Sequence, residues 1–383
     1  MQIPQIPRFF RVIGGLMVVL SVLAGTMVWW LGQPLVPAAG PNQDPQAIAL
    51  ELVVPKGSSA QGVGLVVEDA GLPVSATAFA WTARLLGHHR SLRAGVYGVT
   101  PGLSLQDLIE KMARGDALHD TVTFIEGWRF AEILAALHRH PGVKVSLSTD
   151  PAKAQGELIQ QLGLDLKSIE GWIFPDTYLF MRGSTDLEIL QRAVKLQQAL
   201  LAQAWDARNP HVRLQTPYQA LILASIIERE TQAEFDRSYV SAVFHRRLAE
   251  GMRLESDPTV IYGLGDRFDG DLRKQDLRHP SVYNTYVIAG LPPTPIANPG
   301  RAAIVAAMTP AAGSWRYFVA MGDGRSYFSH SLRQHNQAVR FYQLKKGPEP
   351  PRLDNGPVAL SPPEEDRPPV QQRMVSRQKT VRR

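Results

Sequence analysis

The sequence predicts an α+β protein that is attached to a membrane by one N-terminal helix. Three observations support this fold class. An uncharged stretch of about 20 residues lies near the N-terminus, strand-like and helix-like segments then alternate, and the helical segment 216–231 carries a carboxylate on its apolar side. The chain has 383 residues, which leaves room for two or three domains.

Residues 12–32 form the predicted transmembrane helix. The segment ends in Trp29 and Trp30, and such aromatic residues are typical of a membrane interface. Arg8 and Arg11 precede the segment, and no comparable basic cluster follows closely, so the positive-inside rule places the later residues outside the cytoplasm. A cleaved signal peptide is the alternative, but the apolar run is long and lacks a small-residue cleavage site.

Residues 48–117 are predicted to form a small α+β unit, which follows a linker rich in Pro, Gly and Ala at 33–47. Its predicted segments are a strand at 49–54, a helix starting after 57–59, a helix at 75–86, a strand at 93–99 and a helix from 103 to Gly115. We expect a unit of this size to bind or orient a ligand.

Residues 118–345 predict a second and larger α+β unit. Its segments are a strand at 121–125, a helix at 129–138, a turn-rich stretch at 170–178, helices at 185–204, 216–231 and 235–251, and a late hairpin at 317–328. A capping box between Thr216 and Gln219 marks the start of the helix at 216–231. The tail at 346–383 has few apolar residues and many Pro, Glu and Arg residues, and it is predicted to be disordered.

The helix at 216–231 provides the first functional hypothesis. At about 100° per residue, Leu223, Ile226 and Ile227 cluster on one side of the helix. Glu230 projects within roughly 20–30° of the centre of that cluster, and Glu228 projects almost oppositely. A carboxyl held against apolar surface has a raised pKa, as a general acid at neutral pH requires. The alternative is a helix end where Glu230 simply reaches solvent.

Composition excludes several other functions. The chain has no cysteine, so disulfides, thiolate metal sites and a cysteine nucleophile are impossible. The net charge is +6, and much of the basic excess lies at the extreme C-terminus, in Arg373, Arg377, Lys379, Arg382 and Arg383. No basic stripe with interleaved aromatic residues indicates nucleic-acid binding. No His-Glu-x-x-His, phosphate-binding loop or Gly-x-Ser-x-Gly motif is present, so we expect no metal and no cofactor.

Six short segments contain more Gly, Pro, Asn and aromatic residues than core packing explains. They are 126–128, 170–178, 230–231, 253–263, 283–286 with 290–300, and 334–336. Their Tyr, Trp, Asn and Thr side chains suit a groove for an uncharged glycan, because aromatic rings stack on sugars and amides bond sugar hydroxyl groups. The alternative is that these segments are helix caps, turns and core aromatic residues.

The order of these motifs resembles that of the MltG (YceG-like) family of endolytic murein transglycosylases. The residues that carry the resemblance are Glu-Gly-Trp-Ile-Phe-Pro-Asp-Thr-Tyr at 170–178, Ala-Ser-Ile-Ile-Glu-Arg-Glu-Thr at 224–231, Asp-Pro-Thr-Val-Ile-Tyr-Gly at 257–263 and Tyr-Asn-Thr-Tyr at 283–286. The resemblance extends from the N-terminal anchor to about residue 342. It implies a LysM-like domain at 48–117 and a catalytic transglycosylase domain at 118–345.

The resemblance also implies a reaction and a set of site residues. Glu230, directly before Thr231, is then the single general acid/base, which cleaves the MurNAc-β-1,4-GlcNAc bond of nascent strands and leaves 1,6-anhydro ends. The residues expected to contact substrate are Tyr262, Asn284, Tyr286, Asp257, Tyr178 and Thr231. The implied location is the bacterial inner membrane, with residues 1–11 in the cytoplasm, the catalytic domain in the periplasm, and a peptidoglycan synthase complex as partner.

The chain departs from the family pattern at two places. Glu255 and Ser256 stand where family members often have Gln and Thr, and the additional carboxylate either alters the groove or acts as a second acid. Ser326 stands where a His is common, so the role of that His passes to His330 or His335 if it is retained.

Two other functions remain open. The first is a lysozyme-type hydrolase, in which Glu230 works with a second carboxylate, Asp257 or Glu255. The second is a non-catalytic scaffold that binds peptidoglycan through its LysM-like domain.

Overall fold

The computed structural model describes residues 17–18, 21–22, 25–26, 29–40, 44, 46–231 and 233–351. The predicted cytoplasmic N-terminus, most of the predicted transmembrane helix and residues 352–383 of the predicted disordered tail lie outside the described residues. Within the described ranges, no helix has the length and apolar character to cross a membrane. The chain divides into two compact units, residues 1–197 and 198–383, and each is described by itself.

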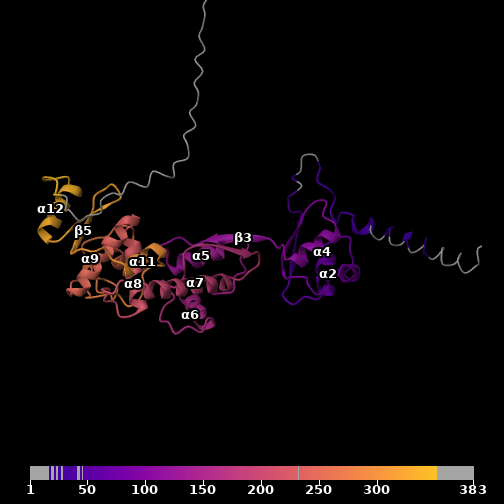
Figure 1. Cartoon of the computed structure of the whole chain (residues 1–383), viewed down its shortest axis with the longest axis horizontal. Helices are drawn as coiled ribbons and strands as arrows, with labels where there is room; N and C mark the ends of the chain where they lie inside the picture. Colours follow the sequence, from indigo (N-terminus) through magenta and orange to yellow (C-terminus); the bar gives the residue numbers. More distant parts are fainter. Residues whose placement is uncertain are drawn as a thin grey trace, which may run out of the picture. The chain divides into compact units, whose positions relative to one another are not determined.

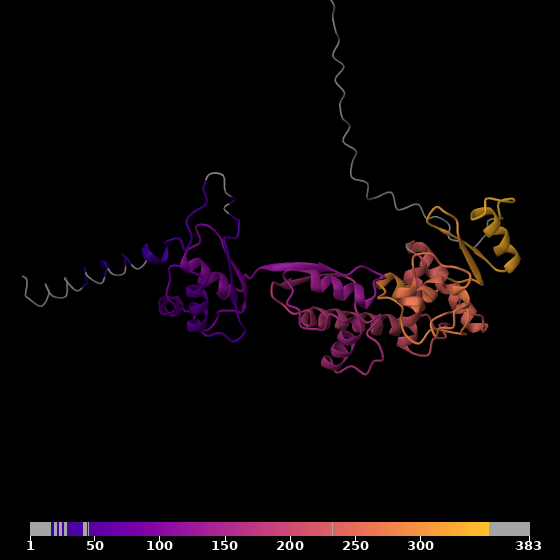
Figure 2. The ribbon, with the colours of Figure 1, turned by 180° about the vertical axis from the view of Figure 1, so that it is seen from behind.

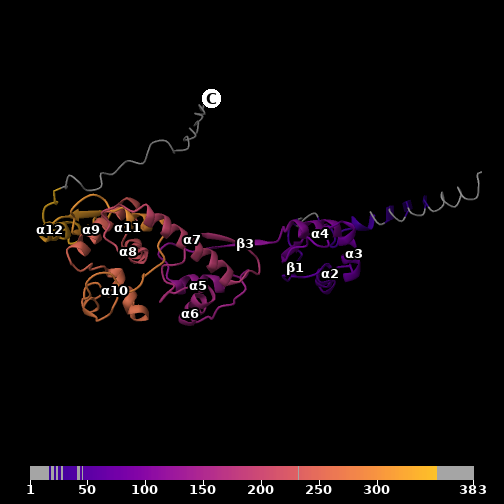
Figure 3. The same cartoon turned by 60° about the horizontal axis from the view of Figure 1, so that its bottom comes forward.

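The first unit begins with a small α+β domain whose elements match the predicted ones to within a few residues (Figures 1 and 3). They are β1 (Leu50–Val54), α2 (Ala60–Asp69), α3 (Ala76–Leu85), β2 (Gly95–Val99) and α4 (Leu105–Arg114). Strands β1 and β2 are antiparallel, with Leu50 opposite Val99. Ser59, Ser75 and Ser104 cap the three helices through their hydroxyl oxygens, which is why each helix starts where it does.

Close packing of α2 on α3 depends on Gly64. A Cβ atom at this position would lie 2.5 Å from the carbonyl oxygen of Ala76, so only glycine lets the two helices approach this closely. The buried core of this domain ends at Ala117, and a separate core begins at Val122. The division of the chain into two compact units falls later, between residues 197 and 198, so the predicted boundary at 117/118 remains a prediction.

The second core belongs to the rest of the first unit. Its elements are β3 (His119–Thr123), α5 (Phe130–Arg139), α6 (Pro151–Gln161), β4 (Thr177–Met181) and α7 (Asp186–Asp206), of which α7 continues past the unit boundary. Strands β3 and β4 pair antiparallel, with His119 opposite Met181. Two elements were not predicted: α6, and β4, whose first two residues fall at the end of the stretch 170–178 that was interpreted as turn-rich.

The second unit consists mainly of helices. Its elements are α8 (Pro217–Glu230), η1 (Glu234–Asp236), α9 (Arg237–Ala249), α10 (Asp257–Leu264), η2 (Gly265–Arg267), η3 (Asp276–Arg278), α11 (Arg301–Met308), β5 (Tyr317–Ala320), β6 (Ser326–Ser329) and α12 (Leu332–Tyr342). The β5–β6 hairpin was predicted, and α12 packs on it (Figure 2). Helices α10 to α12 were not predicted.

Helix α8 is the central helix of this unit, with α9, α10 and α11 packed against it (Figures 1 and 3). Every residue from Ala220 to Glu228 is buried. The prediction of a single apolar side was therefore wrong, because α8 is enclosed on all sides between its first and its last turn.

Candidate active site

Glu230 is the last residue of α8. The helix starts at Thr216, whose hydroxyl oxygen accepts a hydrogen bond from the backbone N–H of Gln219 at 3.2 Å. It ends because Thr231 adopts an extended backbone conformation, with φ −143° and ψ 135°. The hydroxyl oxygen of Thr231 accepts a hydrogen bond from the Ala233 N–H at 3.1 Å. The helix therefore presents the Glu230 carboxyl at its end, next to a fixed change of chain direction.

Residue Glu230 is half-buried, its carboxyl is surrounded by protein, and one short hydrogen bond reaches that carboxyl. The Ser256 hydroxyl donates to its Oε1 at 2.6 Å. Burial by the surrounding protein raises the pKa of Glu230 to about 7, the charge of Asp257 adds to this increase, and the Ser256 hydrogen bond and the Arg247 charge oppose it. At neutral pH the carboxyl therefore populates both its protonated and its ionised form, as a group that first gives and then takes a proton requires.

The position of Ser256 depends on an unusual backbone conformation. Glu255, directly before it, has φ 53°, a left-handed conformation that is rare for a residue other than glycine. The Ser256 N–H donates to the Thr285 hydroxyl oxygen at 2.9 Å, and the Thr259 hydroxyl donates to the Ser256 carbonyl oxygen at 2.6 Å. These bonds fix the loop before α10, so the Ser256 hydroxyl meets the Glu230 carboxyl in a defined orientation.

Asp257 and Tyr286 form a second polar pair close to this carboxyl. The Tyr286 hydroxyl donates to Asp257 Oδ1 at 2.7 Å. Burial, followed by the Asp257 carboxylate, raises the pKa of Tyr286, so its hydroxyl keeps its proton. Asp257 starts α10 and is exposed. The site thus contains one carboxyl that titrates near neutrality and a second, exposed carboxyl that a tyrosine orients.

Glu228 differs from the prediction, which placed it opposite the apolar side. Its side chain is buried, with 5% of its surface exposed, and it accepts a hydrogen bond from Arg237 at 3.1 Å. Its other oxygen accepts the Gly300 N–H at 2.8 Å. Because α8 is enclosed on all sides, a second carboxylate in its last two turns is buried as well, and an arginine neutralises it. Glu228 therefore connects three parts of the fold.

The other residues of the predicted groove have different surroundings. Tyr262 is partly exposed and packs edge-to-face against Tyr283, with ring centroids 4.9 Å apart. Asn284 is buried, and its amide nitrogen donates to backbone carbonyl groups, including that of His279 at 2.8 Å. Tyr178 is buried in the first unit, where its hydroxyl donates to a backbone carbonyl group. Asn284 and Tyr178 therefore support the fold, and Tyr262 alone of these three reaches the surface.

The two histidines considered as replacements for a family histidine stack on aromatic rings. His335, on α12, stacks on Tyr317 with ring centroids 5.3 Å apart. Burial lowers the pKa of His335, so its ring is neutral at pH 7. His330 stacks on Trp315 and contacts the Ser314 hydroxyl. Neither ring is hydrogen-bonded to Glu230. Within the part of the chain that the structure describes, no group of three or more His, Asp or Glu side chains forms a metal site.

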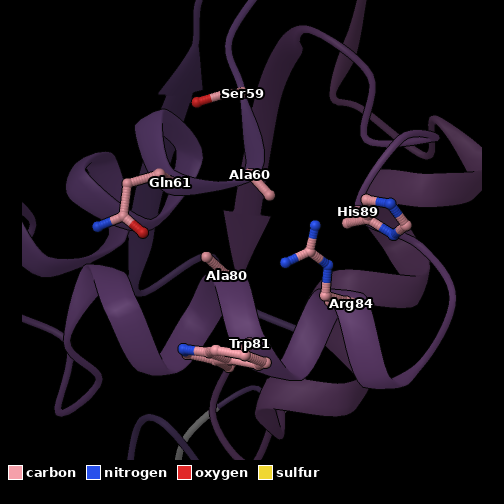
Figure 4. A pocket seen from close by; sticks show the side chains of 7 residues that line it. All are labelled: Ser59, Ala60, Gln61, Ala80, Trp81, Arg84 and His89. Carbon is pink, nitrogen blue, oxygen red and sulfur yellow. The ribbon is translucent and has the colours of Figure 1, made fainter.

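The N-terminal domain contains a cavity that the sequence did not predict (Figure 4). Its volume is about 410 Å³, and the residues that line it are Ser59, Ala60, Gln61, Ala80, Trp81, Arg84 and His89. Trp81 is 66% exposed, and the Arg84 guanidinium lies 5.9 Å from its ring centroid. The sequence signal for this cavity was a tryptophan within the predicted helix at 75–86. Helical periodicity alone does not distinguish an exposed tryptophan from a core residue.

These features define a class of protein: a mixed α+β chain with one candidate general acid/base at the end of a buried helix. The comparisons with known proteins then identify the family. The model of the YceG-like family matches residues 52–341, and the chain belongs to this family.

Two relatives have the same curated description. An endolytic murein transglycosylase of Bacillus subtilis is 31% identical over 324 residues, which cover 80% of this chain and 88% of the relative. An endolytic murein transglycosylase of Streptococcus pneumoniae is 25% identical over 316 residues, and the match spans 57% of its length. Among solved structures, a yceG-like protein of Listeria monocytogenes is 28% identical, with a TM-score of 0.49, over 75% of this chain and 97% of that one.

Proposed function

We propose that this protein is an endolytic peptidoglycan transglycosylase that cleaves the MurNAc-β-1,4-GlcNAc bond of nascent glycan strands. One observation supports the proposal most strongly. The Glu230 carboxyl, with a pKa of about 7, lies at the end of a buried helix and accepts a hydrogen bond from the Ser256 hydroxyl. Membership of the YceG-like family and the description of the Bacillus subtilis relative support the same reaction.

Glu230 performs both proton transfers in the proposed mechanism. Its protonated form donates to the glycosidic oxygen, and the bond from C1 of muramic acid to that oxygen breaks. The resulting carboxylate then takes the proton of the C6 hydroxyl group of the same sugar, and the C6 oxygen bonds to C1. Glu230 returns to its protonated form, and the product has a 1,6-anhydro end. A pKa near neutrality suits both steps, because neither protonation state is costly to reach.

The surroundings of the other carboxylates favour a single acid/base over a lysozyme-type pair. A hydrolase needs a second carboxylate that is free to activate water or to attack the sugar. Asp257 accepts the Tyr286 hydroxyl, and Glu255 is paired with Arg247 at 2.9 Å. Each candidate already has one partner, and the YceG-like family and the description of the Bacillus subtilis relative support an attacking group supplied by the substrate.

The proposal also includes the residues that contact substrate and a membrane anchor. The proposed groove residues are Thr231, which follows Glu230, the bonded pair Asp257 and Tyr286, and the partly exposed Tyr262 of α10. The domain at 48–117 is proposed to be LysM-like and to bind glycan at the cavity beside Trp81 (Figure 4), since an exposed indole ring stacks on sugar rings. Residues 12–32 are the proposed anchor, with the catalytic domain on the periplasmic side near a peptidoglycan synthase complex.

Product mass tests the proposed reaction. The full chain is incubated with uncrosslinked glycan strands, and the new ends are analysed by mass spectrometry. We expect ends that are lighter by one water than hydrolysed ends, because the sugar attacks itself. Reducing ends would indicate the lysozyme-type hydrolase, and intact strands that are bound but not cut would indicate the scaffold.

A further inference from the structure

Arg247, on α9, is a buried cation near the candidate acid, and one carboxylate opposes its charge. Its side chain is 8% exposed, and it donates to the backbone carbonyl oxygens of Leu254 at 3.0 Å and Arg316 at 2.8 Å. Its Nη1 atom also donates to Glu255 Oε2 at 2.9 Å. The carbonyl groups fix the position of the guanidinium, and Glu255 supplies the negative charge.

The charge of Arg247 acts on Glu230. A positive charge near a carboxyl favours its ionised form, and Arg247 accordingly lowers the pKa of Glu230, against the effect of Asp257. On its other side, Arg247 lies 5.2 Å from the ring centroid of Tyr317. His335, which stacks on Tyr317, is neutral at pH 7 and adds no charge there. Glu255 is therefore the group that balances Arg247.

The backbone conformation of Glu255, the residue that pairs with Arg247, is strained. A φ of 53° is strained for a residue with a side chain, and the loop keeps it through the Glu255 N–H, which donates to the Thr285 carbonyl oxygen at 3.2 Å. The same conformation places the side chain on Arg247 and the next residue, Ser256, on Glu230. Strain of this kind is common at functional sites, where surrounding bonds maintain it.

We infer that Glu255 is a positioning residue that neutralises Arg247, so that Glu230 lies beside an ion pair instead of beside an unopposed cation. This inference rests on the proposed function, in which Glu230 must act first as an acid. A glutamine at position 255 still accepts a hydrogen bond from Arg247 but leaves its charge unopposed. The ionised form of Glu230 is then favoured, and the Glu230 carboxyl loses its proton at a lower pH than in the wild type.

The experiment compares the wild type with Glu255→Gln in the full chain. Glu250→Gln is the matched control, because Glu250 also pairs with an arginine, Arg316 at 2.7 Å, and loses the same charge. The Glu230 carboxyl is titrated by ¹³C NMR, with its signal assigned from Glu230→Gln, and the rate of formation of anhydro ends is measured against pH. For Glu255→Gln we expect both midpoints to fall by about 0.5 pH or more, which lowers the rate above the midpoint about threefold. Glu250→Gln is expected to match the wild type.

A conservative variant separates charge from structure. Glu255→Asp keeps the negative charge, so its midpoint is expected to lie closer to that of the wild type than the midpoint of Glu255→Gln does. Equal midpoints for Glu255→Gln and the wild type would overturn the inference, and so would an equal fall in Glu255→Asp or in Glu250→Gln. If the wild type forms no anhydro ends, the proposed function fails, whereas the NMR titration still decides the role of Glu255.

Discussion

The cavity beside Trp81 and the site around Glu230 differ in how far their polar and aromatic groups are exposed to solvent. Around Trp81 the aromatic ring and the polar side chains lie at the surface, where a large ligand can reach them. Around Glu230 the polar groups bond to one another and to the backbone, and the helix that carries the acid is buried. The difference fits the two proposed roles, because binding of a polymer requires access, whereas control of one proton requires a fixed and poorly solvated environment.

Removing the acid tests the second half of this comparison and has the largest expected effect. Glu230→Gln keeps the shape of the side chain but cannot exchange a proton. We expect the rate of formation of anhydro ends to fall at least about 100-fold, measured by mass spectrometry of the products. The control is Glu234→Gln, an exposed glutamate of η1, which is expected to keep full activity. Similar rates for wild type and Glu230→Gln would exclude Glu230 as the acid.

Glu228 tests whether the other carboxylate of the same helix serves the fold alone. Glu228→Ala removes the carboxylate that opposes the charge of the buried Arg237 and the acceptor of the Gly300 N–H. We expect the free energy of unfolding to fall by about 3–5 kcal/mol, measured by chemical denaturation. Glu250→Ala, which breaks an exposed pair with Arg316, is expected to have little effect. A loss of stability no larger than that of the control would contradict a structural role for Glu228.

The raised pKa of Glu230 predicts a pH dependence of stability. Between the ordinary value of 4.5 and about 7, the folded chain keeps a proton that the unfolded chain has released. Stability contributed by this proton is complete below pH 4.5 and is lost as pH rises through 7, by up to about 3 kcal/mol.

The measurement is the difference in free energy of unfolding between Glu230→Gln and the wild type, followed from pH 4 to pH 8. Glutamine does not titrate, so this difference is expected to grow in favour of the variant as pH rises and to level off above 7. A constant difference across this range would mean that the pKa of Glu230 is not raised.

Trp81 tests the first half of the comparison, and its expected effect is the smallest. Trp81→Ala removes a largely exposed ring from the cavity, so we expect the fold to be retained. We expect binding of long glycan strands to weaken about fivefold, corresponding to about 1 kcal/mol, in a sedimentation assay. Trp81→Phe is expected to bind more tightly than Trp81→Ala. Unchanged binding in both variants would place the glycan elsewhere on the protein.

Local signals predicted the N-terminal domain well. Ser59, Ser75 and Ser104 cap helices, and Gly115 ends α4 in a left-handed conformation with φ 80°, so residues close in sequence mark the start of each helix and also the end of α4. In the second unit, α11 has no capping side chain at Gly300 and is packed into the core, and its sequence has no clear period. Elements that depend on distant packing were therefore missed.

The site was predicted in part for a similar reason. The choice of Glu230 relied on a helical wheel, which assumes one buried side and one solvent-facing side. That assumption fails for α8, and the pairing of Glu228 with Arg237 depends on the start of α9, which the wheel does not include. Likewise Asn284 was expected to contact substrate from the family resemblance, and the backbone carbonyl groups to which its amide donates are visible only in three dimensions.

The position of Glu230 as the final residue of α8 has one more consequence. The peptide dipoles of a helix add along its axis, and the C-terminal end carries a partial negative charge on carbonyl groups that lack helical partners. A carboxylate there meets a backbone field of its own sign, so the helix itself favours the protonated acid. Because this contribution to the pKa of Glu230 comes from the main chain, substitutions of neighbouring side chains leave the contribution in place.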